Sequence, residues 1–392
     1  MLKSETVSLF DKKKQYKEIQ KQLNEPNIRI LSAMWKYGPR NLLEVARRIG
    51  MPFTSVYHRV SRIESKAEEI SVLIPAVSKL GMVRATVLVS ASPGCDDEVS
   101  SALRAPNLWR ATGSCEGTYT HISTHLVPVK YLREFRSYIQ ELRDNNLISS
   151  FNIIYTGDYV QNFPDFTSYD PARSQWKFDW EEWFASLTRT SGLVAFDDPR
   201  WPEDYTLSVD KKDLIIIREL GINGRKSFTD IAKTAADDGR GMSAQTVKTR
   251  YENLVSIGIA NCFHIKVLPY PAEVAAYHQI MLEFQSKEEM AKFVSIVPKL
   301  FFVIGIAKVL RENSLILETW MLESQSQKMF SFFSHMVRAG LLQTYSAVRM
   351  NFMDRKTQTI SDELFDNESG WVVDFGKCSS NLGEVASVPQ IS

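Results

Sequence analysis

Apolar residues recur along the chain with two different periods, and the change of period divides the sequence. In residues 27–68 they recur every three or four positions, which is the spacing of one buried helix face, in three short runs that predict three helices. The last run has Val56, Val60 and Ile63 as its buried stripe and follows a turn at Gly50, the pattern of a helix-turn-helix. Residues 69–157 then predict strands and helices in the order βαββαβ, that of a ferredoxin-like sandwich.

The same pattern occurs a second time. Gly241 and Val247 follow Gly50 and Val56 at one constant offset of 191 residues. Upstream of the turn the offset is 186 residues, which places a five-residue insertion at about 236–240, just before the second recognition helix. A second βαββαβ pattern follows. A repeat that keeps its apolar and glycine positions while its polar positions vary indicates one unit used twice.

We therefore predict an α+β chain with two winged or helix-turn-helix DNA-binding domains, each followed by a ferredoxin-like βαββαβ domain. Aromatic residues gather between the halves, either for packing or for docking a partner. The expected boundaries are an N-terminal helix (1–26), helix-turn-helix domain 1 (27–68), ferredoxin-like domain 1 (69–157), an aromatic-rich linker (158–206), helix-turn-helix domain 2 (207–260), ferredoxin-like domain 2 (261–353) and a polar, largely disordered tail (354–392).

Composition narrows the class of protein. Hydrophobic residues make up 44% and charged residues 24% of the 392, the balance of a soluble globular protein. The longest apolar run, residues 300–307, is too short to cross a membrane, and the N-terminus lacks the apolar core of a signal peptide. Four widely spaced cysteines without a CxxC pair fit a reducing cytoplasm. We expect a cytoplasmic, nucleoid-associated protein with no metal and no cofactor.

The net charge is only +1, so nucleic-acid binding would depend on a local patch. Residues 28–66 supply one, because Glu44 and Glu64 are the only acids among eight basic residues. Thr54 and Ser55 can cap the start of the recognition helix. Its outward face would place Ser55, Tyr57, His58 and Arg62 at base edges in the major groove, with Arg40, Arg47, Arg48 and Arg59 on phosphates. For Arg59, pairing with Glu44 or Glu64 is a structural alternative.

The second unit is less basic, because Asp230, Asp237, Asp238 and Glu252 offset its cations. Its predicted base contacts are Gln245, Lys248 and Thr249, and its predicted phosphate contacts are Lys226 and Arg250. Because the two polar faces differ, one chain should favour an asymmetric site on double-stranded DNA. Alternatively, the second unit has lost DNA contact and serves architecture.

Together these patterns resemble the Lrp/AsnC (feast/famine) transcription regulators of bacteria and archaea. The resemblance is most specific at Ala46-Arg47-Arg48-Ile49-Gly50, at His58-Arg59-Val60 and in the turn that begins at Gly113. It implies a DNA-binding regulator that is not an enzyme, and a homodimer or, with two copies in one chain, an intramolecular pseudo-dimer. It also implies that the ferredoxin-like domains are of the effector-binding (RAM) type, with an amino-acid effector near Gly113, Glu116 and Gly305. The sequence departs from the family at Ser114, where an aspartate is usual.

Enzymatic alternatives have few residues to support them. His121 and His125 have the spacing of metal ligands on a helix, but their neighbours predict a strand. No glycine-rich phosphate loop, zinc-ligand set or nucleophile elbow is present. The sirohaem decarboxylases resemble Lrp/AsnC proteins and also occur as paired copies, so a tetrapyrrole enzyme stays an alternative, with His121, His125, His264 or His278 facing the substrate. A further alternative is a non-enzymatic protein that keeps the fold for assembly and does not bind DNA.

Overall fold

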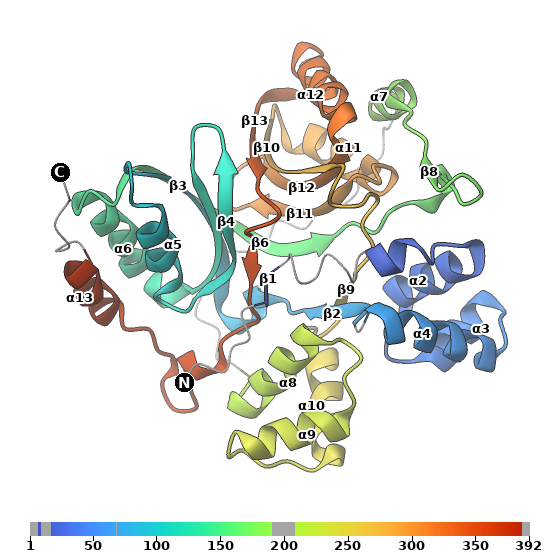
Figure 1. The fold of residues 1–392 in the computed structure, drawn as a ribbon, viewed down its shortest axis with the longest axis horizontal. Helices are drawn as coiled ribbons and strands as arrows, with labels where there is room; N and C mark the ends of the chain where they lie inside the picture. The colour runs from blue at the N-terminus through green and yellow to red at the C-terminus, as the bar shows by residue number, and fades with distance from the viewer. Residues whose placement is uncertain (1–6, 9–16, 68, 190–207, 386–392) are drawn as a thin grey trace.

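Each half of the chain begins with three short helices, as the computed structural model in Figure 1 shows. The structure describes residues 7–8, 17–67, 69–189 and 208–385. The helix predicted for residues 1–26 lies mostly outside this range, and Val7–Ser8 is a short strand, β1, paired with β14 (Lys356–Thr357). No helix in the described part is long and apolar enough to span a membrane.

Local capping interactions define where the helices of the first helix-turn-helix domain begin and end. The Asn24 and Asn41 side chains accept hydrogen bonds from Asn27 N and Glu44 N at the starts of two helices, and Gly50 ends the second in a left-handed conformation with φ 65°. The third helix begins at Phe53, so Thr54 and Ser55 lie inside its first turn and do not cap it. These helices are α2 (Glu25–Tyr37), α3 (Leu42–Ile49) and α4 (Phe53–Ala67).

The second helix-turn-helix domain has the same order. Asp210 forms a capping box with Asp213 at the start of its first helix, and Ser243 caps its third. Its helices are α8 (Lys211–Ile222), α9 (Phe228–Asp237) and α10 (Ala244–Ser256).

Both ferredoxin-like domains are present, which confirms the predicted α+β class. The first consists of β3 (Met82–Ala91), α5 (Asp96–Arg104), β4 (Trp109–Glu116), β5 (His121–Pro128), α6 (Leu132–Asp144) and β6 (Ile148–Gln161). The second consists of β10 (Ala275–Phe284), α11 (Lys287–Ile296), β11 (Val303–Val309), β12 (Ser314–Leu322), α12 (Glu323–Arg338) and β13 (Leu342–Met350).

The two sheets join edge to edge into one closed ring. Its strand order is β4-β13-β10-β12-β11-β6-β3-β5, and β5 pairs back to β4. The joints between the copies are antiparallel, with Gly305 opposite Gln161 on one side and Arg349 opposite Glu116 on the other. Closure pairs the edges of the eight ring strands within one chain, and the short strands β14 and β1 extend the sheet from β4. The two ferredoxin-like domains therefore share one barrel, whose outer faces are covered by α5 and α6 on one side and by α11 and α12 on the other (Figure 1).

The helix-turn-helix domains are exchanged between the halves. Strand β2 (Ser71–Ile74) pairs antiparallel with β9 (Cys262–Ile265), so the links that follow the two domains run side by side. Leu73 of β2 is buried in the core of the second helix-turn-helix domain, while Ile265 of β9 is buried in the core of the first. Each domain thus uses apolar surface from the opposite half.

The linker and the tail are also copies of one unit. We call residues 162–189 the first arm and residues 358–385 the second arm. Each has a short 3-10 turn, a small hairpin and a helix, so the second arm is ordered, unlike the disordered tail predicted from its polar composition. The first arm contains η3 (Phe166–Ser168), β7 (Tyr169–Asp170), β8 (Gln175–Trp176) and α7 (Trp180–Arg189); the second contains η5 (Asp362–Leu364), β15 (Phe365–Asp366), β16 (Gly370–Trp371) and α13 (Phe375–Val385).

The arms cross between the halves. In Figure 1, α7 lies beside the second ferredoxin-like domain and α13 beside the first. Trp176 stacks on Phe301 with ring centroids 4.6 Å apart, and the Phe375 ring of α13 lies 5.8 Å from that of Tyr138 on α6. The hairpin tryptophans Trp176 and Trp371 are both buried, and this burial orders the arms.

Candidate functional site

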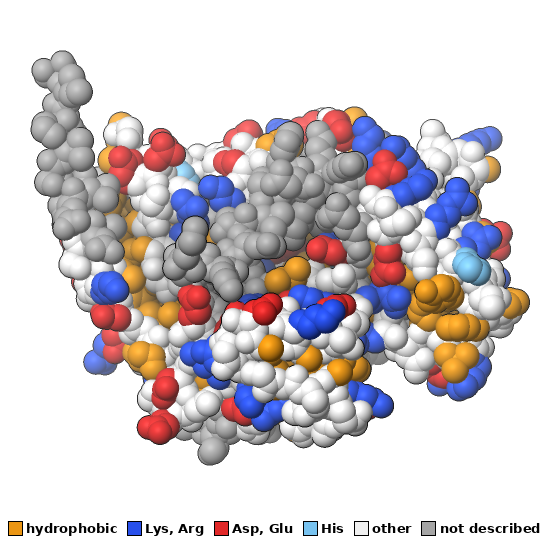
Figure 2. Space-filling view, turned by 60° about the horizontal axis from the view of Figure 1, so that its bottom comes forward, with side chains coloured by type: hydrophobic (Ala, Val, Ile, Leu, Met, Phe, Trp, Pro, Cys, Tyr) orange, Lys and Arg blue, Asp and Glu red, His pale blue; other side chains and the backbone are white. Residues whose placement is uncertain are grey.

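The outward face of α4 is exposed, as predicted. Val56, Val60 and Ile63 are buried, whereas Tyr57, His58 and Arg62 face solvent and Ser55 is half-buried. Figure 2 shows hydrophobic and basic side chains gathered at the right of the molecule, over the first helix-turn-helix domain. Exposed donors and aromatic rings on one helix are the chemistry that nucleic-acid bases and phosphates require.

The basic residues around α4 have partners within their own domain. Arg47 and Arg48 are exposed, and both bind the Glu44 carboxylate, at 2.8 and 2.7 Å. Arg59 donates to Asn27 Oδ1 at 3.1 Å, so its structural partner is on α2 and is neither Glu44 nor Glu64. Exposed ion pairs are weak and exchange readily with phosphate.

Arg40 lies in the contact between the two helix-turn-helix domains, away from the α4 face. Its Nη1 donates to the main-chain oxygens of Gly224 and Lys226 at 2.9 and 3.0 Å, and its guanidinium lies 4.4 Å from the centroid of the Phe228 ring. Burial lowers the pKa of Arg40. From the other side, Arg225 binds Glu64 at 2.5 Å. The two domains are therefore clamped together by one arginine from each.

In the second unit the predicted phosphate contacts are neutralised. Arg250 Nη1 lies 3.0 Å from both Asp210 and Asp213, and Lys226 binds Glu219. Lys248 lies 3.8 Å from Glu252, while Gln245 and Thr249 are exposed. The predicted base contacts of α10 thus reach solvent, but its charge is largely balanced.

The residues predicted for effector binding are not brought together. Gly113 on β4 lies against the chain after β13, where the Asp354 carboxylate accepts from Ser114 N at 3.2 Å. Glu116 is exposed, 3.7 Å from Arg349. Gly305 lies on β11, four strands away around the ring, with the Tyr159 ring packed over it.

A buried polar cluster inside the barrel was not predicted from the sequence. Glu318 accepts hydrogen bonds from Arg84 at 3.2 Å, from the Tyr277 hydroxyl at 2.9 Å and from the Tyr159 hydroxyl at 3.4 Å. The Arg355 guanidinium lies 5.0 Å from the centroid of the Tyr277 ring. Burial raises the pKa of both tyrosines, which keeps their hydroxyls protonated as donors. The sequence signal for this cluster was a single charged residue in each of two largely apolar strands, Arg84 in β3 and Glu318 in β12.

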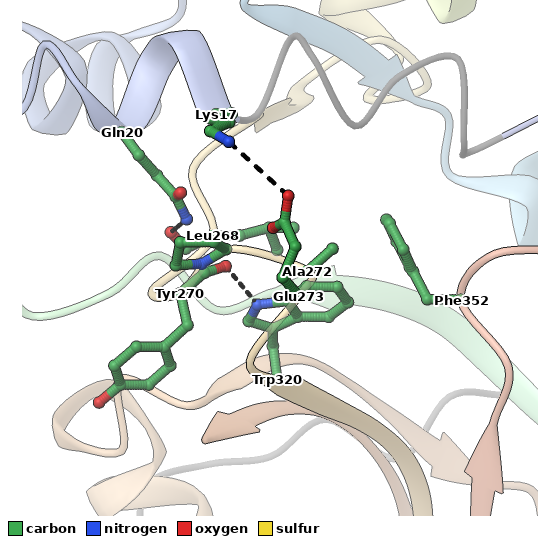
Figure 3. A pocket seen from close by; sticks show the side chains of 9 residues that line it. Lys17, Gln20, Leu268, Tyr270, Ala272, Glu273, Trp320 and Phe352 are labelled. Carbon is green, nitrogen blue, oxygen red and sulfur yellow. Dashed lines mark hydrogen bonds and ion pairs between the residues drawn. The ribbon is translucent and has the colours of Figure 1, made fainter. Parts of the chain in front are cut away.

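Two hollows open on the barrel. One, of about 230 Å³ including open solvent, lies between Gln20 and Trp320, whose indole donates to Tyr270 O at 2.7 Å. Lys17 and Glu273, 3.8 Å apart, lie at its rim (Figure 3). The other, of about 220 Å³, lies beside Arg110. These volumes include open solvent, and the enclosed part of each hollow is about the size of one water molecule.

The histidines of the sheets face the helices and not the barrel interior. His121 and His125 lie on strand β5, as their neighbours indicated. The buried His125 ring lies 5.0 Å from Phe135 on α6, and burial lowers its pKa to about 3. His278 packs against Phe330 on α12, and burial lowers its pKa to about 4. Within the described ranges, no three His, Cys, Asp or Glu residues are grouped to hold a metal.

Comparison with known proteins supports the fold. No family model and no curated protein matches the chain. The crystal structure of the sirohaem decarboxylase NirDL is similar at a TM-score of 0.54 and 11% identity, covering 92% of this chain and 100% of that one. Its complex with an iron-uroporphyrin III analogue is similar at a TM-score of 0.50 and 12% identity, covering 88% of this chain and 93% of that chain. The likeness shows that the chain has the NirDL fold along almost its whole length.

Regulators of the Lrp/AsnC type match a shorter part. The Neisseria meningitidis regulator NMB0573 with L-Met covers 34% of this chain and 88% of its own at 12% identity and a TM-score of 0.29. AsnC of E. coli covers 36% of this chain and 91% of its own at 16% identity and a TM-score of 0.27. The prediction that the protein is not an enzyme is wrong on this comparison, because the solved structure that spans the chain is an enzyme. The lack of a linear catalytic motif did not exclude catalysis on this fold.

Proposed function

We propose that the protein is an enzyme of the sirohaem-decarboxylase kind, acting on the carboxylate side chains of a tetrapyrrole. The observation that carries the proposal is the match of the whole two-copy chain, both halves in one polypeptide, to NirDL. The NirDL complex contains an iron-uroporphyrin III analogue, which makes a carboxylate-rich macrocycle the substrate class to test.

The cluster inside the barrel supplies chemistry suited to this reaction. Glu318 is a carboxylate held by one guanidinium and two phenols, so the cluster demonstrates the arrangement that binds a carboxyl group. Arg110 and Arg355 add positive charge nearby. A substrate carboxylate that replaced the Glu318 carboxylate as the partner of Arg84 would be oriented by the Arg84 guanidinium. It would then lie beside the neutral hydroxyl of Tyr277.

Decarboxylation of an acetate side chain needs few catalytic groups. The bond between the methylene carbon and the carboxyl carbon breaks, carbon dioxide leaves, and the electron pair stays on the methylene carbon. One proton completes a methyl group there. The Tyr277 hydroxyl, whose pKa is raised by burial, is the proton donor that we assign.

The test is titration of the full chain with sirohaem under reducing, oxygen-free conditions, read as a shift of the Soret band and as loss of carbon dioxide by mass spectrometry. We expect binding by the wild-type protein and by Tyr277→Phe, with product formation lowered at least about tenfold in the variant. Arg47→Gln, on the exposed face of α3, is the matched control. Absence of a Soret shift and of product with wild-type protein would refute the proposal.

A second function is favoured by the exposed face of α4, namely DNA binding through the first helix-turn-helix domain. Tyr57, His58 and Arg62 face solvent there. The assay is a gel shift with random-sequence duplexes over a salt series. Arg62→Ala together with Arg48→Ala should weaken binding and flatten its salt dependence by about two units of slope. Lys248→Ala with Thr249→Ala on α10 is the matched control. Equal affinity of both variants and the wild type would contradict reading by α4.

A further inference from the structure

The exposed aromatic rings of the described residues all lie on the first helix-turn-helix domain. There are four of them, and one, Trp35, already has a packing partner, because it stacks on Phe163 with ring centroids 5.6 Å apart. The other three are Tyr37, Phe53 and Tyr57, with 40%, 44% and 50% of each residue exposed. Large rings left in water on one domain mark a surface that binds something.

The three rings lie among basic and polar side chains. On α4, the Phe53 and Tyr57 rings are one turn apart with centroids separated by 6.1 Å, and the His58 ring lies 5.8 Å from that of Tyr57. The Arg48 guanidinium of α3 lies 5.1 Å from the centroid of the Tyr37 ring. Figure 2 shows hydrophobic and basic side chains together on this side of the molecule. We call the following residues the aromatic-basic surface: Tyr37, Arg48, Phe53, Tyr57, His58 and Arg62.

The charge of this region favours an anionic partner. Arg62 and Lys36 are exposed, and no carboxylate among the described residues forms an ion pair with either. Glu44 is the one carboxylate bound by Arg47 and Arg48 together, so this group of three keeps a positive charge. A region that is locally cationic in a nearly neutral chain attracts a polyanion.

The second copy shows that the fold does not require exposed rings at these positions. At the offset of 191 residues, Phe53 and Tyr57 correspond to Ala244 and Lys248. These two residues lie in the first half of α10, which forms the same helix of the repeated unit without an aromatic residue at either position. The rings of the first copy are therefore explained by a ligand better than by folding.

The exposed rings distinguish between two forms of nucleic acid. In a duplex the base faces are stacked on one another, and only base edges and methyl groups reach the grooves. A single strand can present the faces of its bases. Aromatic side chains that stack on those faces, together with cations that bind the phosphates, are the usual means of binding a single strand.

We propose that the aromatic-basic surface binds single-stranded nucleic acid. Bases stack on Phe53 and Tyr57, and Arg48 and Arg62 bind phosphates. The inference rests on the proposed binding of nucleic acid by the first helix-turn-helix domain, and it names the form that this domain prefers. It does not depend on the decarboxylase proposal.

The experiment is titration of labelled oligonucleotides with the full chain, read by fluorescence anisotropy. The probes are a thymidine strand of about 16 nucleotides, a uridine strand of that length, the thymidine strand paired with its complement, and an abasic strand that keeps the phosphates without bases. We expect a base-carrying single strand to bind more tightly than the duplex and at least about tenfold more tightly than the abasic strand, because one stacked base accounts for roughly that factor. The stronger of the thymidine and uridine strands identifies DNA or RNA, and either supports the proposal.

A double variant separates stacking from charge. Phe53→Ala with Tyr57→Lys installs the residues of the second copy, removing two rings and adding one positive charge. Binding through charge alone would become stronger, whereas stacking predicts binding at least about tenfold weaker. Val255→Lys, at an exposed apolar residue of α10, adds the same charge without removing a ring and should not weaken binding. Circular dichroism checks that both variants fold.

The outcomes separate this inference from the proposed function. If the duplex binds at least as tightly as the single strands, the inference is overturned and DNA binding by the domain stands. If the double variant binds the single strand as tightly as the wild type does, the rings do not stack on bases and the inference is again overturned. Absence of binding to every probe overturns both.

Discussion

Removal of the Glu318 carboxylate should destabilise the barrel strongly. Glu318→Leu keeps a side chain of similar bulk but deletes the acceptor for Arg84, Tyr277 and Tyr159. Only 9% of the Glu318 side chain and 17% of the Arg84 side chain are exposed, so water does not replace the lost partner. Breaking one side of a buried ion pair costs about 3–5 kcal/mol, and two phenols lose an acceptor as well.

The double variant decides whether this cost comes from the unpaired charge. Arg84→Met with Glu318→Leu removes both charges, and an apolar pair of similar volume is close to neutral in many buried sites. We therefore expect most of the loss caused by Glu318→Leu to be recovered. The two effects should couple by more than about 2 kcal/mol in a double-mutant cycle.

The assay is urea unfolding followed by far-ultraviolet circular dichroism and by tryptophan fluorescence, with all four proteins at one pH. Coincidence of the two probes shows that a single free energy describes the transition. If Glu318→Leu loses less than about 1 kcal/mol, or the double variant is no better than the single one, the cluster is not a buried charge pair and the reasoning fails.

Three further predictions follow from burial. Burial lowers the pKa of His125 to about 3 and that of His278 to about 4, from an ordinary 6.5. The unfolded chain therefore takes up protons first as the pH falls, and between pH 7 and pH 5 each histidine should lower the free energy of unfolding by about 2 kcal/mol. In urea unfolding, His125→Phe should lose its share of this pH dependence of stability. In Gly305→Ala the new Cβ would lie 1.8 Å from the Tyr159 hydroxyl, so unfolding should show a loss of about 1–3 kcal/mol, reduced in a Tyr159→Ala background. Arg40→Ala removes two hydrogen bonds between the helix-turn-helix domains, and amide exchange near Gly224 should become faster while the barrel strands are unchanged.

The sequence was sufficient for the parts of the fold that depend on local periodicity. Both helix-turn-helix domains and both βαββαβ units follow from apolar spacing and glycine turns. Closure of the barrel does not, because the pairing of β6 with β11 and of β4 with β13 joins strands from different copies. The second arm was predicted to be largely disordered, because its buried residues, such as Phe365 and Trp371, are few and lie among polar neighbours.

The candidate sites were only partly accessible to sequence reasoning. The outward face of α4 could be predicted from the helical spacing of its apolar residues. The position of Arg40 between the two helix-turn-helix domains could not, because it depends on the contact with Gly224. Arg84 and Glu318 are 234 residues apart in the chain, so no local pattern joins them.

The central claim is that this two-copy fold acts on the carboxylates of a tetrapyrrole. The most direct measurement is mass spectrometry of sirohaem after incubation with the purified full chain, with the Tyr277→Phe and Arg84→Gln variants alongside. The account predicts loss of carbon dioxide with the wild-type protein and strongly reduced loss with either variant. Unchanged sirohaem after prolonged incubation with folded wild-type protein, or equal turnover by all three proteins, would contradict it.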